Sequence, residues 1–388
     1  MAEKKNFDEL EAMLADPDVP DAAIRPYLRV VPEETRPFVP VVQPDPDRVV
    51  LRPLDEVRAR GFGFLDWANR WSRRRRYARF MRHFEADDPA PVLVSEGDSW
   101  FQFPLFLDDT IDLLAPHYLI FSLDAAGDTL INMTGPGREY LEPLFDPKVG
   151  PRVRGLLFSA GGNDIIGVEP SPDGDVPVLA KLLIRRRPDL APAAHIREDE
   201  LEKRLAAIET GYRRVLEEVA KHRPGVFVVG HGYAYAIPAF PGDPRNPRWT
   251  KHGGWLRDPL AALGFSEPSE QRAIVRVLID RLYERLARLM GGNCPGGAYP
   301  HGWLVDCRDI LAEVNDWADE IHPTDAPERG FARVAARFHE VIRNALAAVE
   351  SRTTERPHRA GATERPARVR QNANSVNRGS TERPHSSS

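Results

Sequence analysis

Apolar residues are concentrated in five short runs between residues 91 and 306. These runs are PVLVS (91–95), YLIFS (118–122), GLLFS (155–159), VFVVG (226–230) and WLVD (303–306). Four or five residues with little polar interruption are typical of strands that are buried on both faces, as in a parallel sheet. The sequence therefore predicts about five parallel strands.

Three longer stretches between and after these runs have apolar residues three or four positions apart, the spacing of an amphipathic helix. They cover residues 202–221, 274–286 and 331–346. Alternating strands and helices predict a doubly wound α/β domain over residues 91–350. In such a domain, ligands bind at the carboxyl ends of the strands.

Residues 1–90 are predicted to be an N-terminal extension. Residues 17–53 are rich in Pro, Val and Asp, whereas residues 62–84 combine aromatic and basic residues at helical spacing. Such a helix either packs its aromatic side on the neighbouring domain and leaves its arginines in solvent, or lies on an anionic membrane surface. We favour packing over peripheral membrane contact because Asp66 and Glu85 flank the segment and its apolar face is short.

The C-terminal residues 351–388 have a different composition. They contain the degenerate repeat TERPHR, TERPAR and TERPHS, with eight arginines, three glutamates and almost no large apolar residue. A segment of this kind cannot bury enough apolar surface to fold alone. We predict a disordered tail with no part in a functional site.

The charge and the cysteines narrow the class of protein. The net charge of −5 gives no reason to expect nucleic acid as a partner. Cys294 and Cys307 are too few for a disulfide framework, and we interpret them as reduced thiols. No secretory signal or membrane-spanning stretch is recognisable, so we expect a cytoplasmic protein, with export by a route without a cleaved signal as the open alternative.

Residues with catalytic potential follow the predicted strands. VSEGDSWFQF (94–103) presents Ser99 after the first strand, DAAGDTL (124–130) contains Gly127, and SAGGNDIIG (159–167) contains Asn163. WADEIHPTD (317–325) places Asp319 three residues before His322. A serine nucleophile needs a base, usually a histidine oriented by a carboxylate, and its oxyanion needs N–H donors. These segments contain each of those groups.

Each motif alone is weak, but the four together resemble the SGNH hydrolases, the GDSL-type esterases and lipases. The matching blocks are GDSW (97–100), AAGDT (125–129), GGND (161–164) and DEIH (319–322). The resemblance covers the α/β domain only. It implies a flavodoxin-like three-layer α/β/α sandwich and ester hydrolysis through an acyl-enzyme, without cofactor or metal. It also implies a Ser99–His322–Asp319 triad and an oxyanion hole formed by Ser99, Gly127 and Asn163.

The sequence departs from the family at the rim of the site. Trp100 replaces the usual leucine after the nucleophile, and long insertions occupy residues 165–200 and 231–258. The candidate substrate-binding residues are Trp100 and four aromatic residues of the second insertion, Tyr233, Tyr235, Trp249 and Trp255. The aromatic residues of the insertion either form a lid or acceptor cleft over Ser99 or cover the edge of the sheet. His231, without a carboxylate nearby in sequence, is interpreted as a structural or pocket-lining residue.

The function expected from these motifs is hydrolysis of a small-molecule or lipid ester. Two alternatives stay open at this point. One is a carbohydrate O-deacetylase or acyltransferase on the same scaffold. The other is a non-catalytic binding protein that acts through its terminal segments, which the intact set of Ser99, Gly127, Asn163 and His322 disfavours.

Overall fold

The structure is a computed structural model that describes residues 4–31, 42–53, 64–169, 171–172, 174–245 and 254–354. Its centre is a five-stranded, entirely parallel sheet in the order β11-β10-β7-β5-β6. The strands are β5 (Val92–Gly97), β6 (Leu119–Ser122), β7 (Val153–Ser159), β10 (Phe227–His231) and β11 (Gly302–Val305). Each coincides with a predicted apolar run, so the predicted parallel sheet is confirmed.

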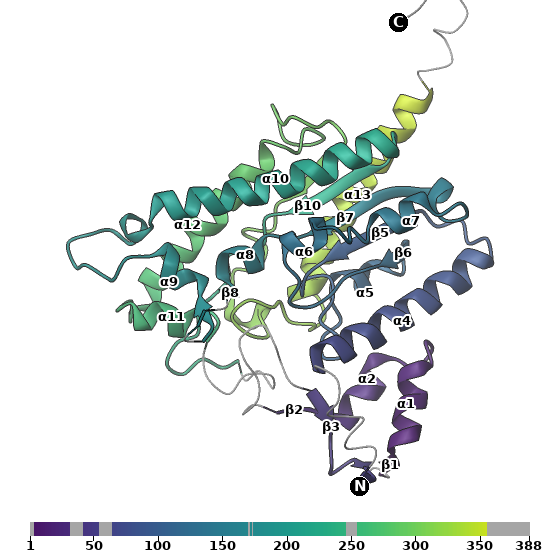
Figure 1. Ribbon diagram of the computed structural model, residues 1–388, viewed down its shortest axis with the longest axis horizontal. Helices are drawn as coiled ribbons and strands as arrows, with labels where there is room; N and C mark the ends of the chain where they lie inside the picture. The colour runs from purple at the N-terminus through teal and green to yellow at the C-terminus, as the bar shows by residue number, and fades with distance from the viewer. Residues whose placement is uncertain are drawn as a thin grey trace, which may run out of the picture. The chain divides into compact units, whose positions relative to one another are not determined.

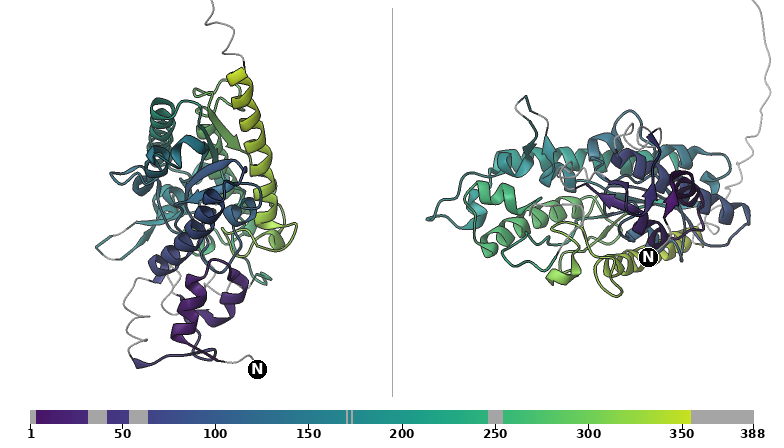
Figure 2. Two further views of the ribbon diagram at one scale, coloured as in Figure 1. Left: turned by 90° about the vertical axis from the view of Figure 1, so that its right-hand side faces the viewer. Right: turned by 90° about the horizontal axis from the view of Figure 1, so that it is seen from below.

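Helices cover both faces of this sheet, as predicted for the three-layer sandwich. The long helices α10 (Glu198–His222) and α13 (Gly330–Thr354) lie on opposite faces (Figures 1 and 2). Tyr212 of α10 packs edge-on against Phe158 of β7 at a ring distance of 5.1 Å. Phe338 of α13 contacts Phe101, which follows β5, at 5.5 Å. The predicted helix over 274–286 is the central part of α12 (Pro268–Ala287).

Further elements complete the described part of the fold. The remaining helices are α1 (Phe7–Ala15), α2 (Asp21–Ile24), α4 (Phe64–Glu85), α5 (Thr110–Leu114), α6 (Leu130–Thr134), α7 (Leu141–Phe145), α8 (Gly162–Ile166), α9 (Val178–Leu182) and α11 (Arg257–Ala262). Two-residue or three-residue strands pair as β1 (Lys5–Asn6) with β4 (Val49–Val50), β2 (Leu28–Val30) with β3 (Val42–Pro44), and β8 (Val168–Glu169) with β9 (Val176–Pro177).

The strand order places the site. The first strand of the sheet in sequence, β5, lies between β6 and β7, so the chain reverses its direction of winding there. This is the flavodoxin-like order, in which a crevice opens at the carboxyl ends of the two strands beside the reversal point. Ser99 follows β5 and Asn163 follows β7. The topology therefore brings these two segments to the same edge of the sheet.

The aromatic and basic segment predicted at 62–84 forms α4, which packs against β6. Phe80 is buried and contacts Phe121 of β6 at a ring distance of 5.2 Å. The expectation that the arginines of this helix stay in solvent is wrong for Arg75 and Arg76, which are buried. Arg76 donates to Asp109 (2.6 Å) and to the Phe101 carbonyl (2.7 Å). A guanidinium is tolerated in the interior when it is paired in this way.

The chain divides into two units, residues 1–349 and residues 350–388. The N-terminal residues up to 90 that are described belong to the first of these units. Within it, Arg75 of α4 donates to the carbonyls of Met13 (2.9 Å) and Asp16 (2.8 Å), which connects α4 to α1. Most of the predicted tail, residues 355–388, lies outside the described residues.

Candidate active site

Ser99 lies in a tight turn directly after β5. The turn begins at Gly97, where an added Cβ would lie 2.6 Å from the ring of Phe101 and 2.8 Å from Cβ of Ser159. A glycine is therefore required by close approach rather than by an unusual φ angle. Asp98 stabilises the turn, because its Oδ1 accepts the N–H of Trp100 at 3.0 Å and its own N–H donates to the Ser159 carbonyl at 3.1 Å.

His322 and Asp319 meet Ser99 from a segment more than 200 residues away. The distance between Ser99 Oγ and His322 Nε2 is 2.9 Å, and that between His322 Nδ1 and Asp319 Oδ2 is 2.6 Å. All three side chains are buried or nearly so. Oδ1 of Asp319 accepts the backbone N–H groups of Ile321 (2.8 Å) and His322 (2.7 Å), which fixes the carboxylate within its own turn.

These contacts assign the hydrogens on the imidazole. Because Asp319 Oδ2 can only accept, Nδ1 of His322 carries the proton and Nε2 is left as the acceptor for the Ser99 hydroxyl. The imidazole ring packs edge-on against Phe103 at 4.5 Å and Trp255 at 5.8 Å, which restricts its rotation. This arrangement can move a proton from the hydroxyl to the histidine.

Three N–H groups are candidates for binding an oxyanion. Within the part of the chain that the structure describes, the backbone N–H groups of Ser99 and Gly127 donate no hydrogen bond. Gly127 has a φ of +81°, a conformation that favours glycine. The Asn163 amide donates one hydrogen to the Asp128 carbonyl at 2.7 Å, and an NH₂ group has a second hydrogen to offer.

A buried hydrogen-bond network, centred on Asp98, lies behind the serine. Oδ2 of Asp98 accepts from the hydroxyl of Tyr233 at 2.5 Å, and Oδ1 accepts from the hydroxyl of Ser159 at 2.9 Å. Tyr233 in turn accepts the N–H of Gly162 at 3.1 Å, and Ser159 contacts His231 Nε2 at 2.7 Å. Burial raises the pKa of Asp98 to about 6, although the hydrogen bonds from Tyr233, Trp100 and Ser159 act in the opposite direction.

Tyr233 connects two segments that are separate in sequence. Its hydroxyl contacts both the turn that contains Ser99 and the GGND segment that contains Asn163. It also has a φ of +63° although it is not a glycine, a strained conformation that surrounding contacts must maintain. Tyr233 therefore fixes the distance between the two sides of the candidate oxyanion site.

Glu320 connects the second insertion, residues 231–258, to the DEIH segment by hydrogen bonds. Its Oε1 accepts the N–H groups of Ala239 (2.6 Å) and Arg257 (2.9 Å), and its Oε2 accepts that of Leu256 (2.8 Å). Burial raises the pKa of Glu320 to about 7, while these three backbone donors lower it. Arg245 adds a second connection by donating to the Asp319 carbonyl at 2.7 Å. The insertion thus stabilises the turn that presents His322.

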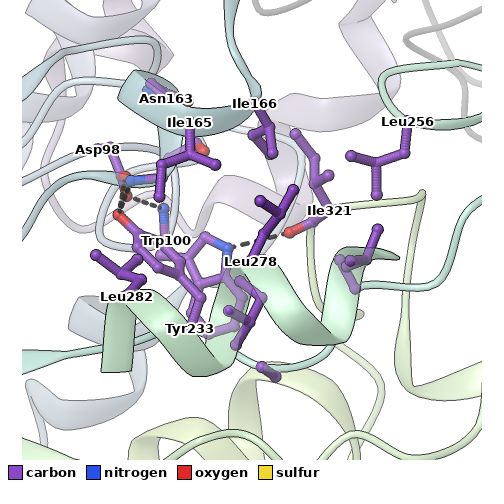
Figure 3. A pocket seen from close by; sticks show the side chains of 16 residues that line it. Asp98, Trp100, Asn163, Ile165, Ile166, Tyr233, Leu256, Leu278, Leu282 and Ile321 are labelled. Atoms are coloured by element: carbon purple, nitrogen blue, oxygen red, sulfur yellow. Dashed lines mark hydrogen bonds between the residues drawn. The ribbon is translucent and has the colours of Figure 1, made fainter. Parts of the chain in front are cut away.

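A pocket opens beside Ser99 and Asn163 (Figure 3). Its cavity volume is about 50 Å³. Ile165 and Ile166 of α8 form one side, and Leu278 and Leu282 of α12 form the other. The lining is thus almost entirely apolar apart from its end at Ser99.

The structure brings together only some of the aromatic residues predicted to bind substrate. Trp100 and Tyr233 line the pocket, and the Trp100 indole N–H donates to the Ile321 carbonyl at 3.0 Å. Tyr235 instead donates to Asp280 at 2.5 Å and does not line the pocket. Trp255 contacts the ring of His322, and Trp249 lies outside the described residues.

His231, expected to be either structural or pocket-lining, is fully buried, contacts Ser159 of the Asp98 network and is not among the described residues that line the pocket. Sequence reasoning did not identify the contributions of Ser159, Glu320 or α12. For α12 the sequence held no signal of this contribution, since its buried residues form a single stripe at the three- and four-residue spacing of any amphipathic helix. They are Gln271, Ile274, Val275, Leu278, Leu282 and Leu286. For Ser159 and Glu320, partners more than 60 residues away decide the role.

Two further findings on the described residues concern membrane-spanning helices and metal-binding groups. No helix there has both the length and the apolar composition to cross a membrane. No group of three or more His, Cys, Asp or Glu side chains in those ranges is arranged to hold a metal ion. Cys294 and Cys307 are both buried and unbonded to each other.

Comparison with known proteins gives only distant similarity. No protein-family model and no curated protein sequence match this chain. Among solved structures, a lipase from a goat rumen metagenome is 11% identical with a TM-score of 0.37, over 64% of this chain and 96% of that one. An extracellular lipase from Streptomyces rimosus is 14% identical with a TM-score of 0.37, over 65% and 100%.

A carbohydrate esterase family 2 enzyme from Myceliophthora fergusii is 16% identical with a TM-score of 0.29, over 68% of each chain. Likenesses of this size carry no argument about activity. The case for a function therefore depends on the geometry of the site.

Proposed function

We propose that this chain is a serine hydrolase that cleaves carboxylic esters through a covalent acyl-enzyme. The observation that carries the proposal is the hydrogen-bonded series of Ser99 Oγ, His322 and Asp319, with distances of 2.9 and 2.6 Å. It lies at the carboxyl edge of a parallel sheet and beside an apolar pocket. Either feature alone would be weaker support.

In the proposed reaction, Nε2 of His322 takes the proton of Ser99 as Oγ attacks the ester carbonyl carbon. Asp319 keeps Nδ1 protonated and stabilises the imidazolium that forms. The negative charge on the carbonyl oxygen is bound by the N–H groups of Ser99 and Gly127 and by the Asn163 amide. The imidazolium then donates its proton to the alcohol oxygen as the C–O bond breaks, which leaves the acyl group on Ser99.

Deacylation reverses these roles. A water molecule gives one proton to Nε2 of His322 as its oxygen attacks the acyl carbon. The tetrahedral intermediate collapses, the proton returns to Ser99 Oγ, and the carboxylic acid leaves. No step consumes an oxidant, a reductant or a second substrate other than water.

Labelling with a fluorophosphonate probe tests this proposal. Wild-type protein should be labelled and Ser99→Ala should not, with turnover of p-nitrophenyl butyrate reduced by a factor of about 10⁴ or more. Ser159→Ala is the matched control, because Ser159 is also a buried serine hydrogen-bonded to a histidine. It should still be labelled. Equal labelling of Ser99→Ala and wild type would refute the assignment of the nucleophile.

A further inference from the structure

The position of the pocket beside Ser99 decides which part of an ester it can bind. Ser99 and Asn163 are among the residues that line it, whereas His322 is not among the described residues that line it. In the proposed reaction the departing alcohol oxygen must face Nε2 of His322, because it takes its proton from there. The acyl substituent occupies a different corner of the tetrahedral intermediate. The alcohol therefore leaves on the histidine side, and the pocket remains for the acyl chain.

We infer that this pocket is the acyl-binding site and that it selects short aliphatic acyl groups. The inference rests on the proposed function and adds the class of substrate to it. A hydroxylated or charged group placed between the leucines and isoleucines of the pocket would lose its hydrogen bonds to water without replacement. A sugar is consequently excluded from the pocket and could occupy only the alcohol side.

The size of the pocket sets the chain length. One water-sized group needs roughly 10–15 Å³ of such a cavity, so the observed volume of about 50 Å³ holds three to five methylene-sized groups. This corresponds to acyl groups from butyryl to hexanoyl. Each methylene that becomes buried should increase kcat/KM about fourfold, until the volume is filled.

Helix α12 forms one side of the pocket. Val275, Leu278, Ile279 and Leu282 line the pocket and share one face, since they are spaced three and four residues apart. Ile279 is only partly buried, so its replacement should leave the protein folded. Val277 is also partly buried but does not line the pocket, which makes it a matched control.

The experiment measures kcat/KM for two series of esters with wild type, Ile279→Ala, Ile279→Phe and Val277→Ala. The first series varies the acyl group from acetyl to palmitoyl in p-nitrophenyl esters. The second keeps butyryl constant and varies the alcohol from ethyl to hexyl. Far-ultraviolet circular dichroism and thermal unfolding verify that each variant is folded.

We expect wild type to be most active between butyryl and hexanoyl, and at least tenfold less active on palmitoyl. Ile279→Phe should shift the optimum towards acetyl and lower the hexanoyl rate about tenfold, whereas Ile279→Ala should shift the optimum to longer chains. Val277→Ala should keep the wild-type profile. In the alcohol series, all four proteins should show the same profile.

Two results would overturn the inference while leaving the hydrolase proposal in place. One is an acyl profile that neither Ile279 variant shifts, and the other is a shift confined to the alcohol series. Absence of turnover on every ester, together with absence of fluorophosphonate labelling in wild type, would instead refute the proposed function itself.

Discussion

Two serine–histidine pairs lie within the same site, and their surroundings give them opposite properties. Ser99 and His322 are 2.9 Å apart, and Ser159 and His231 are 2.7 Å apart. Both serines follow or end a central strand, and both histidines are buried. Distance alone therefore does not identify which serine can act as a nucleophile.

The difference lies at the other nitrogen of each imidazole. Nδ1 of His322 faces the carboxylate of Asp319, so it carries the hydrogen and Nε2 is a base. Nδ1 of His231 accepts the backbone N–H of Tyr233 at 3.3 Å, so in the neutral ring Nε2 carries the hydrogen and donates it to Ser159. His231 cannot take a proton from Ser159, because the nitrogen facing that serine already carries one.

Burial strengthens the contrast. It lowers the pKa of His231 to about 3, and both ring nitrogens of that residue are engaged by groups other than a carboxylate. Ser159 is fully buried and its hydroxyl donates a hydrogen bond to Asp98, whereas Ser99 lines the pocket. A serine–histidine contact thus has catalytic potential only if a carboxylate accepts from the other nitrogen of the histidine and the serine lines a pocket.

The largest difference should appear in the rates of two histidine variants. His322→Gln should lower kcat/KM for p-nitrophenyl butyrate about 10⁴-fold, since the base for Ser99 is lost. His231→Gln should stay within about tenfold of wild type, because a glutamine amide can still donate to Ser159. Steady-state kinetics at pH 8 would decide. Comparable losses in both variants would show that the two pairs do not differ as described.

A smaller effect on rate is expected from Tyr233→Phe. When the Tyr233 hydroxyl is removed, Asp98 loses a hydrogen-bond donor and the N–H of Gly162 loses its acceptor. The turns that contain Ser99 and Asn163 are then no longer connected through this side chain. We expect kcat to fall about 10–100-fold with KM within about twofold of wild type, because the oxyanion exists only after attack.

Tyr140→Phe is the control for Tyr233→Phe. Tyr140 is also fully buried, and its hydroxyl donates to Glu218 at 2.5 Å, away from the site. The two variants should lose similar stability, but only Tyr233→Phe should lose kcat. An unchanged kcat in Tyr233→Phe would mean that this hydroxyl has a role in stability alone.

The smallest expected effect concerns stability against pH. The pKa of His231 is lowered from 6.5 to about 3, so the unfolded chain binds a proton at this residue more readily than the folded protein. Its contribution to stability is complete above pH 6.5 and is lost as the pH falls towards 3. Between pH 7 and pH 5, wild type should therefore lose about 2 kcal/mol more of its free energy of unfolding than His231→Gln.

Urea denaturation at pH 7 and pH 5 measures that difference. The exposed residue His222 supplies the comparison, and His222→Gln should keep the wild-type loss. Asp98 and Glu320 have raised pKa values and so act in the opposite direction, but they do so equally in all three proteins. Parallel losses in wild type and His231→Gln would contradict the proposed protonation state of His231.

The sequence alone predicted the five strands, the three long helices and the residues at the strand ends. It could do so because apolar periodicity depends only on neighbouring positions in the sequence, and because glycine, serine and asparagine favour the turns that follow strands. It also predicted that Ser99, Asp319 and His322 belong to one site, and the structure places them in contact; their catalytic role stays a prediction.

Other features could not be predicted in this way. The pocket is lined by residues of α8 and α12, which are separated by about a hundred residues and are brought together only by the tertiary fold. The buried arginines of α4 are a similar case. Arg76 resembles a solvent-exposed charge in sequence, but its carboxylate partners lie on another segment, at Asp109 and Asp112.

The sequence by itself thus determined which elements form and which reactive groups follow them. Tertiary structure alone decided the proton positions on the two histidines, the strained conformation of Tyr233 and the shape of the pocket beside Ser99. The physical reason is that a proton position depends on which donor or acceptor lies within about 3 Å. For His322 one of its two partners, Ser99, is more than 200 residues away, and no local pattern encodes that distance.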